Sequence, residues 1–319
     1  MQIKGISLRG LEVFEALARS GSVAQAAVDT GLSQPAVSQQ MRNLETALAT
    51  PLLDHSRRPM HLTPAGRGFL RRATAALSEL RLATAEVAQM DLAHLTELSL
   101  GVIDDFDDDL TPQLALIMAE NLAGCRFRLL SAGSHDLVRM VRDGSLHMAV
   151  SASTGEVSEA LVEYPLTRDP FIMVVPSQAG NPPEALLSGT ADLPFLRYAT
   201  GQLIARQIEE ALADQTAALS ARFEIGSHLA LMAMVARGIG WTVTTPLGYL
   251  RAARFHDRIT ACPLPGGTAA RQISLYTGAD WNGTVPTDIA TAVRGLIDVR
   301  MIAPALERMP WLDGQFHLL

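Results

Sequence analysis

Apolar residues near the start of the chain recur with the spacing of α-helices. In residues 8–18 (LRGLEVFEALA) they recur every three residues, and in residues 34–48 (QPAVSQQMRNLETAL) every three or four. Such spacing places them on one face of a helix. Between these segments, Ser22 is a good N-cap for a shorter helix over residues 23–30, and Gly31 suits a tight turn. The pattern predicts three helices, the last two forming a helix-turn-helix.

The polar positions of residues 34–48 carry hydroxyl and amide side chains. These groups hydrogen-bond base edges and phosphate oxygens without long charged stems. Gln34 and Gln39 suit adenine, and Arg42 suits a guanine or a phosphate. The segment therefore predicts a DNA-reading surface.

A hairpin and a long helix follow. Arg57 and Arg58 lie between two apolar segments, 52–53 and 60–62, where they suit contacts with the DNA backbone or minor groove; the alternative is a solvated charge cluster. Thr63 and Pro64 then open a helix. Its apolar residues repeat with heptad spacing, which predicts a paired coiled coil, the alternative being a helix packed on its own domain. The predicted seam comprises Phe69, Ala73, Ala76, Leu80, Ala83 and Val87.

From residue 98 onward, short β-like segments alternate with helical ones. The strand candidates are LSLGVI, CRFRLL, LHMAV, FIMVV, FLRYA, ARFEI, GWTVT and RQISLYT. This alternation predicts α/β units built on parallel sheets. Ligands of such sheets bind at the carboxyl ends of strands. Here those ends lead into DDFDDDLTP (104–112), SAGSHD (131–136) and GSH (226–228).

The charge is unevenly distributed along the chain. The net charge is −7, yet residues 1–95 hold ten Lys and Arg against eight acidic residues, a balance of +2. The remainder holds 16 against 25, a balance of −9. A mildly basic front on an acidic body fits a DNA-binding module joined to a domain with another task.

Several classes of chemistry find no support in the sequence. There is no glycine-rich phosphate loop, HExxH or GxSxG motif, and the eight histidines are scattered, so we expect no enzyme, metal or cofactor. Cys125 and Cys262 are interpreted as buried thiols, with a redox pair as the alternative. The chain starts without a secretion signal, and no apolar run approaches the roughly 20 residues of a membrane span. We expect a cytoplasmic protein with no membrane partner.

Residues 21–48 (GSVAQAAVDTGLSQPAVSQQMRNLETAL) and 50–70 (TPLLDHSRRPMHLTPAGRGFL) resemble the LysR-type transcriptional regulators. That family usually has glycine at the position of Ala49, and phenylalanine and arginine at those of Leu53 and His55. These departures predict a slightly altered turn before the wing and put a phosphate contact near residue 55 in question. The resemblance implies DNA contacts, with the recognition helix in the major groove, by Ser22, Ser33, Gln34, Pro35, Ser38, Gln39, Arg42, Arg57 and Arg58.

The resemblance also implies an organisation. Residues 1–63 would form an all-α winged helix-turn-helix domain, 64–95 a dimerising linker helix, and 96–303 an α/β effector domain with a C-terminal tail at 304–319. The effector domain would have two Rossmann-like subdomains resembling periplasmic binding proteins: subdomain I at 97–168 and 268–303, and subdomain II at 169–267. The resemblance implies a tetramer built from two dimers that binds promoter DNA, with RNA polymerase as a further candidate partner.

A ligand cleft is implied at the hinge between the subdomains. The implied effector contacts are Asp104, Asp105, Phe106, Ser134, Thr200, Gly201, Ser227 and His228, although such residues can also serve as helix caps. The five aspartates between residues 104 and 109 repel one another and need compensating charge. We therefore expect a cationic or zwitterionic effector; the alternatives are a solvated acidic loop, an anionic effector or redox sensing by the cysteines. A solute-binding protein without a DNA role is a more distant alternative.

Overall fold

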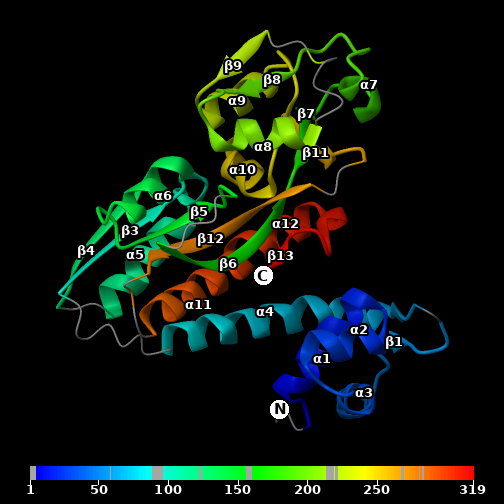
Figure 1. The fold of residues 1–319 in the computed structure, drawn as a ribbon. Coiled ribbons are helices and arrows are strands. Elements are labelled where there is room, and N and C mark those ends of the chain that lie inside the picture. Colours follow the sequence, from blue (N-terminus) through cyan, green and yellow to red (C-terminus); the bar gives the residue numbers. More distant parts are fainter. Residues whose placement is uncertain are drawn as a thin grey trace. The chain divides into compact units, whose positions relative to one another are not determined.

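Two compact units make up the chain (Figure 1). The computed structural model describes residues 5–57, 59–87, 96–121, 124–155, 160–212, 219, 222–266, 269–279, 281 and 284–319. The N-terminal unit spans Met1–Thr84 and the C-terminal unit Ala85–Leu319. Within these described ranges, no helix combines the length and apolar character needed to cross a membrane.

The N-terminal unit contains the predicted helices and hairpin. Helices α1 (Leu8–Ser20), α2 (Val23–Thr30) and α3 (Gln34–Leu48) each begin after a serine whose hydroxyl accepts a backbone N–H. Strands β1 (Leu53–Asp54) and β2 (His61–Leu62) pair antiparallel as a wing. Serine N-caps satisfy N–H groups that lack a partner inside the helix, which explains why the helices start where they do.

Ala49 ends α3 in the left-handed conformation, with φ of 50°. Its N–H donates to the carbonyls of Glu45 and Thr46, as at a glycine-terminated helix end. The expected change of the turn at this position therefore does not occur. The turn keeps the glycine-like geometry, and the alanine side chain is held in a conformation that L-residues disfavour.

Helix α4 (Pro64–Val87) packs its first half onto the same unit. Gly66 passes so close to the hairpin that an added Cβ would lie 2.0 Å from the Leu52 carbonyl oxygen, which explains the glycine of the LTPAG segment. Ala73 and Leu77 are buried in the core, and the ring of Phe69 packs against that of Phe14 in a tilted arrangement, with centroids 5.8 Å apart.

These contacts correct part of the predicted dimer seam. Phe69 and Ala73 belong to the hydrophobic core of their own unit, where Phe69 lies against Phe14 of α1. Ala76 is exposed, and Leu80 is 43% exposed. The side chains of Ala83 and Val87 lie outside the described part of the chain, as does Arg58 in the wing.

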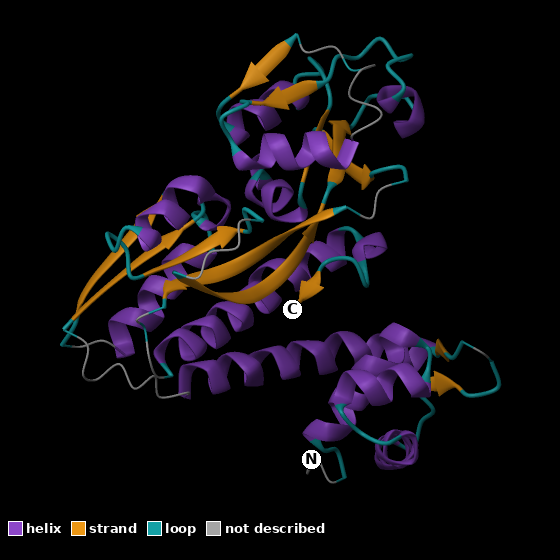
Figure 2. Cartoon of the chain, in the orientation of Figure 1, coloured by secondary structure: helices purple, strands orange, loops and turns teal. Residues whose placement is uncertain are grey.

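A six-stranded mixed sheet forms the larger half of the C-terminal unit, in the order β13-β6-β12-β5-β3-β4. On one face lie α5 (Leu110–Asn121) and α11 (Val285–Ile297), and α6 (Ser134–Arg142) packs against β5 and β12 (Figure 2). The 3-10 turn η1 (Asp104–Phe106) follows β3. The strands are β3 (Glu97–Val102), β4 (Arg126–Ser131), β5 (Met148–Ala152), β6 (Leu161–Pro170), β12 (Ala270–Gly278) and β13 (His317–Leu318).

The smaller half occupies residues 171–269 and has two short sheets, β10-β7-β11 and β8-β9. The chain enters it after β6 and returns through β12, so two antiparallel strands connect the subdomains. Its strands are β7 (Ile172–Pro176), β8 (Leu196–Tyr198), β9 (Phe223–Ile225), β10 (Thr242–Thr244) and β11 (Ile259–Pro263). Its helices are α7 (Pro183–Leu187), α8 (Leu203–Leu212), α9 (His228–Val235), α10 (Pro246–Arg251) and the 3-10 turn η3 (Ala253–Phe255).

Two features of this unit differ from the expectation. The sheets are mixed: β3 is parallel to β4 and β5, and β8 to β9, but the connecting strands β6 and β12 run antiparallel to each other. Residues 304–319 are not a separate tail. The π-helix η4 (Asp298–Ile302) runs into α12 (Ala303–Arg308), the turn η5 (Pro310–Leu312) follows, and β13 extends the main sheet by pairing with β6.

Candidate DNA-binding surface and effector cavity

Helix α3 presents its polar face to solvent. Gln34, Gln39 and Arg42 are exposed, and the apolar residues of the helix are buried. The Gln39 Oε1 accepts a hydrogen bond from Arg42 Nη2 at 3.0 Å, and its Nε2 donates to Asn43 Oδ1 at 2.8 Å. Because residues three and four apart are neighbours on a helix, these contacts align three polar side chains along one face.

The other predicted DNA contacts surround this row. Ser33 and Ser22 are N-caps that accept from the backbone N–H groups of Ala36 and Gln25, both at 3.4 Å. Pro35 is exposed in the first turn of α3, and Ser38 is half-buried. The hydroxyls of Ser22 and Ser33 thus fix the helix starts.

Glu45 fixes the wing to the end of α3. Its Oε1 accepts from the backbone N–H groups of Leu52 at 2.7 Å and Leu53 at 3.1 Å, and its Oε2 lies 2.8 Å from His55 Nε2. Glu45 lies within the segment that resembles the LysR family, but the sequence alone assigns it no role. At position 55, the histidine lies against this carboxylate.

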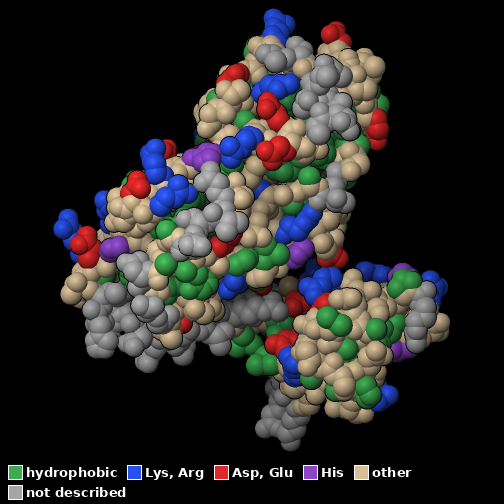
Figure 3. Space-filling view, viewed as in Figure 1, with side chains coloured by type: hydrophobic (Ala, Val, Ile, Leu, Met, Phe, Trp, Pro, Cys, Tyr) green, Lys and Arg blue, Asp and Glu red, His purple; other side chains and the backbone are tan. Residues whose placement is uncertain are grey.

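Basic side chains gather near the wing of the N-terminal unit (Figure 3). Arg57 forms an ion pair with Asp54 at 3.1 Å. His55, Arg57, His61 and Arg67 line a groove along the wing and the start of α4. The predicted DNA contacts among the described residues therefore comprise a hydrogen-bonding row with one arginine on α3 and a charged groove at the wing.

In the C-terminal unit, a cavity of about 220 Å³ lies where strand ends of both subdomains meet. Of the predicted effector contacts, five line it: Asp104, Asp105, Ser134, Gly201 and His228. The lining also includes Tyr198 and Arg271, which sequence reasoning missed. A cavity of this size suits a small metabolite rather than a drug-sized ligand.

Three predicted effector contacts do not line the cavity. Phe106 is fully buried in the core. Thr200 points its N–H and hydroxyl to the Glu224 carboxylate, at 2.9 and 3.2 Å. Ser227 caps α9 through Ala230 N. The capping alternative therefore holds for Ser227.

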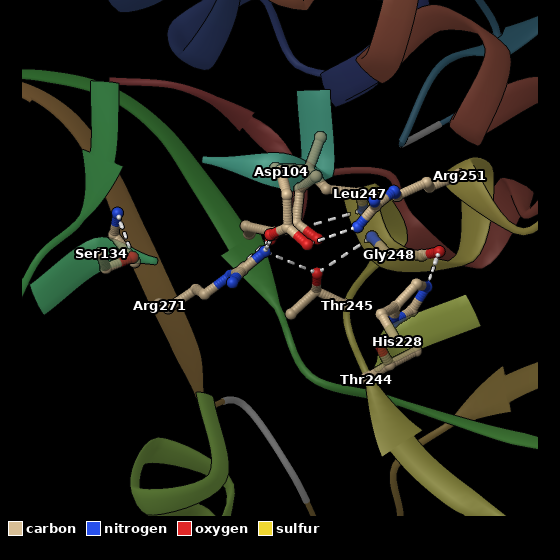
Figure 4. Close-up of polar contacts among 12 residues, drawn as sticks. Asp104, Ser134, His228, Thr244, Thr245, Leu247, Gly248, Arg251 and Arg271 are labelled. Atoms are coloured by element: carbon tan, nitrogen blue, oxygen red, sulfur yellow. Dashed lines mark hydrogen bonds and ion pairs between the residues drawn. The ribbon is translucent and has the colours of Figure 1, made fainter. Parts of the chain in front are cut away.

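Arg271 on β12 holds two carboxylates together beside the cavity. Its Nη2 lies 2.6 Å from Asp105 Oδ2, and its Nε lies 2.8 Å from Asp169 Oδ2. It also donates to Thr245 Oγ1 at 3.1 Å, and Asp169 Oδ1 accepts from the first turn of α10 at Leu247 N, 3.5 Å away (Figure 4).

One guanidinium between two buried carboxylates leaves the cluster with an excess of negative charge. Burial acts to raise the pKa of Asp105, but Arg271 and its hydrogen bond outweigh burial and hold that pKa below its usual value. For Asp169, burial prevails and raises the pKa to about 6, with the charge of Asp105 adding to the effect. The two carboxylates of this cluster therefore titrate differently.

His228 is held by a directed chain of hydrogen bonds. Its Nε2 lies 2.7 Å from the Gly248 carbonyl oxygen, which accepts, so Nε2 carries the proton. Burial lowers the pKa of His228, which keeps the ring neutral. Nδ1 therefore accepts from the Tyr198 hydroxyl at 2.7 Å, and Tyr198 in turn accepts from Thr244 Oγ1 at 2.9 Å. An added Cβ on Gly248 would lie 2.9 Å from His228 Cε1 and 2.6 Å from Thr244 Oγ1.

Asp104 stands apart from this buried cluster. Its side chain is 56% exposed, and its Oδ2 lies 2.7 Å from Nη1 of Arg251, at the end of α10. Burial acts to lower the pKa of Arg251, but Asp104 outweighs it and the pKa is raised. Arg251 therefore stays positively charged.

Two family models match the chain. The LysR substrate binding domain matches residues 94–281, more than half of the chain. The bacterial regulatory helix-turn-helix protein of the lysR family matches residues 8–67. This chain is a LysR-type transcriptional regulator. Because the family consists of DNA-binding regulators, the enzyme alternative is excluded.

Relatives of this LysR-type regulator have similar lengths. It is 28% identical to the HTH-type transcriptional regulator BbuR of Bordetella bronchiseptica, over 75% of this chain and 74% of that protein. It is 28% identical to a hydrogen peroxide-inducible genes activator of Pectobacterium carotovorum, over 82% and 85%.

Solved structures share the fold of this regulator. A hydrogen peroxide-bound mutant of Corynebacterium glutamicum OxyR matches with a TM-score of 0.55 and 22% identity, over 94% of this chain and 97% of that one. Full-length BenM matches with a TM-score of 0.52 and 19% identity, over 92% and 98%.

The aspartates of the LysR-type regulator have partners in its own chain. Asp104 pairs with Arg251, Asp105 with Arg271, and Asp109 lies 4.0 Å from Arg300. Asp107 accepts from the Ser131 hydroxyl. Three of the five aspartates thus have an arginine partner in the chain itself, so part of the compensation that the sequence argument assigned to a ligand is internal. Asp104 nevertheless remains exposed on the cavity wall.

The cysteines of the LysR-type regulator are poor candidates for redox chemistry. Cys125 precedes β4 and Cys262 lies in β11; both are free thiols, and neither lines the cavity. Both are half-buried, so the interpretation as fully buried thiols was wrong. Burial raises the pKa of Cys125, and it raises that of Cys262 to about 11, with Glu184 adding to the latter. Because the thiolate is the reactive form, these environments disfavour oxidation.

Proposed function

We propose that this regulator binds its operator as a dimer through α3 and the wing, and that a small zwitterion in the cavity switches it. The DNA role rests on the exposed row of Gln39, Arg42 and Asn43 together with the charged wing groove. Neutral amides read base edges, and charged groups hold phosphates. Promoter DNA and the effector are thus its two ligands.

The pairing of two copies is assigned to the second half of α4. Leu80 is 43% exposed and Ala76 is exposed on a helix whose first half is already covered by its own unit. Pairing of this segment between two copies would bury apolar surface. It would also bring two helix-turn-helix domains to DNA half-sites of matching spacing. Leu80→Glu is therefore expected to lower the dimer fraction in sedimentation experiments, with Arg72→Glu on an exposed position of α4 as control. An unchanged dimer in Leu80→Glu would contradict this assignment.

The zwitterion is favoured by two features of one cavity. Asp104 offers an exposed carboxylate, which suits an ammonium group. Helix α6 begins at the cavity after Gly133 without a side-chain cap, and the carboxylate of its first turn, Asp136, is paired with Arg139. The positive end of the helix is therefore available to a ligand carboxylate. The coexistence of both features in 220 Å³ is the observation that carries this proposal.

Titration of the full-length regulator with free amino acids, with amines and with dicarboxylates tests the effector class. Calorimetry should show binding for an amino acid and none for the matched amine or dicarboxylate. Selective binding of a plain dicarboxylate would contradict the zwitterion. In parallel, the affinity for the upstream DNA should fall steeply as salt is raised, because phosphate contacts release counterions.

A further inference from the structure

Two neighbouring aspartates of the cavity differ in how they are held. Asp105 is 12% exposed and is enclosed with Arg271, Asp169 and Thr245. Asp104 is 56% exposed, faces the cavity, and has one described ion pair, with Arg251 across the subdomain boundary (Figure 4). A ligand can therefore reach Asp104 without disrupting the buried cluster.

Asp104 is the ion-pair partner of Arg251 among the described residues, and Asp105 and Asp108 favour the charge of Arg251 from farther away. The side chain of Arg251 is 13% exposed, and its Nε has no hydrogen-bond partner among the described residues. A buried charge that loses its partner is strongly destabilising unless it moves to water. If a ligand's positive group takes over Asp104, the guanidinium of Arg251 must become hydrated, and the end of α10 must move with it.

Helix α10 is anchored firmly at its other end. Its N-cap Thr245 contacts Arg271, the N–H of Leu247 points to Asp169, and the Gly248 carbonyl accepts from His228. The first turn of α10 is thus fixed by buried polar groups. Its last turn is held by the ion pair of Arg251 with Asp104 and by Tyr249, whose carbonyl accepts from His256 Nε2 at 2.8 Å. Loss of that pair would tilt one end of the helix about the other.

We propose that Asp104 reads the positively charged group of the effector by giving up its ion pair with Arg251, and that the freed end of α10 carries the signal into subdomain II. This inference rests on the proposed effector cavity. It assigns the specificity for a cationic group to Asp104 and makes Arg251 the internal competitor of the ligand. The ligand shifts the equilibrium between the two positions of α10 only as far as it binds one of them more tightly than the other.

Hydrogen exchange of the full-length protein tests the pair without any ligand. In Asp104→Asn and in Arg251→Met, amides 249–251 should exchange roughly three- to tenfold faster, because one restraint on the last turn is gone. Arg254→Met removes an equal charge nearby and should leave the exchange unchanged. The double variant with Asp104→Arg and Arg251→Asp should restore protection. Equal exchange in the wild type and both single variants would overturn the proposal.

Calorimetric binding of free amino acids to the same proteins tests the exchange of partners. Arg251→Met should bind the responding amino acid several-fold tighter than the wild type, and Asp104→Asn should lose binding at least tenfold. Unchanged binding in Asp104→Asn would overturn this inference while leaving the effector cavity intact. Absence of binding by every amino acid would overturn both the zwitterion and its recognition by Asp104. Cooperative thermal melting of each variant establishes that it is folded.

Discussion

The two units of this regulator differ in where their polar side chains lie. In the N-terminal unit, Gln39, Arg42 and Asn43 are exposed and touch one another along a single helix. In the C-terminal unit, Asp105, Asp169 and Arg271 come from three separate segments and are largely enclosed. The first arrangement leaves side chains available to a partner. The second uses them to hold the two subdomains together, so changes there are expected to affect stability first.

The largest effect is expected from Arg271→Met, which leaves two buried carboxylates without their shared cation. Removing one partner of a buried ion pair typically costs about 3–5 kcal/mol. Urea unfolding of the C-terminal transition should therefore show a marked loss of stability. The control Arg254→Met removes an arginine that stacks on Phe255 at the surface and should change stability little. Similar unfolding midpoints for both variants would remove the contrast between the two units.

A change on the exposed row should affect DNA binding instead of stability. Arg42→Ala is expected to weaken operator binding by about 1–3 kcal/mol if the guanidinium contacts a base. Fluorescence anisotropy with operator and scrambled duplexes measures this, with Arg254→Ala as the control of equal charge. An equal loss on both duplexes would assign Arg42 to phosphate contacts and leave base reading to the glutamines.

The buried unit should also respond to pH through His228. The native state resists protonation because burial lowers the pKa of His228, whereas the unfolded chain takes up the proton near pH 6.5. The contribution of His228 to the free energy of unfolding is therefore fully present above pH 6.5. It decreases as the pH falls below that value, by up to about 1.4 kcal/mol per pH unit. Asp169, with its pKa raised to about 6, acts in the opposite direction between pH 4 and 6.

Comparison with His228→Gln isolates the histidine from the carboxylates. Glutamine can donate to Gly248 and accept from Tyr198 without titrating in this range. The stability of the wild type should therefore decrease relative to the variant between pH 7 and 5, measured by urea unfolding. Parallel pH curves would show that His228 does not carry this dependence.

The smallest expected effect is a gain in stability when Ala49 is replaced. Replacement by glycine relieves a left-handed alanine, and part of that gain is offset by the extra flexibility of glycine. Ala49→Gly should stabilise the N-terminal unit by about 0.5–1 kcal/mol. Ala24→Gly, at an exposed position inside α2, should destabilise it by a similar amount. A loss of stability in Ala49→Gly would mean that the turn does not strain the alanine.

The contrast between the units also explains what the sequence reveals. The parts of the DNA-binding surface lie within about forty consecutive residues, so spacing and capping residues predict the helices α1 to α3 and the exposed row on α3. The first half of α4 was predicted less well, because the heptad spacing of Phe69 and Ala73 does not say whether the facing surface belongs to the same unit or to a second copy.

In the C-terminal unit, the eight strands with apolar patterns were predicted, whereas β6, β11 and β13 were missed. Strand β6 contains Pro165, Arg168 and Asp169, and β13 has two residues, so neither shows a strand pattern. Strand ends pointed to Asp104, Asp105 and Ser134. Arg271 lies on a connecting strand, 166 residues along the chain from Asp105, and no local pattern links it to the cavity.

The fixed proton of His228 provides a spectroscopic reporter. A ring N–H that is shielded from water and donates to a carbonyl exchanges slowly, so it should give its own downfield proton resonance. Because His228 also lines the cavity, that resonance would shift when a ligand binds beside the ring. A single one-dimensional spectrum would then follow occupancy of the cavity without any label.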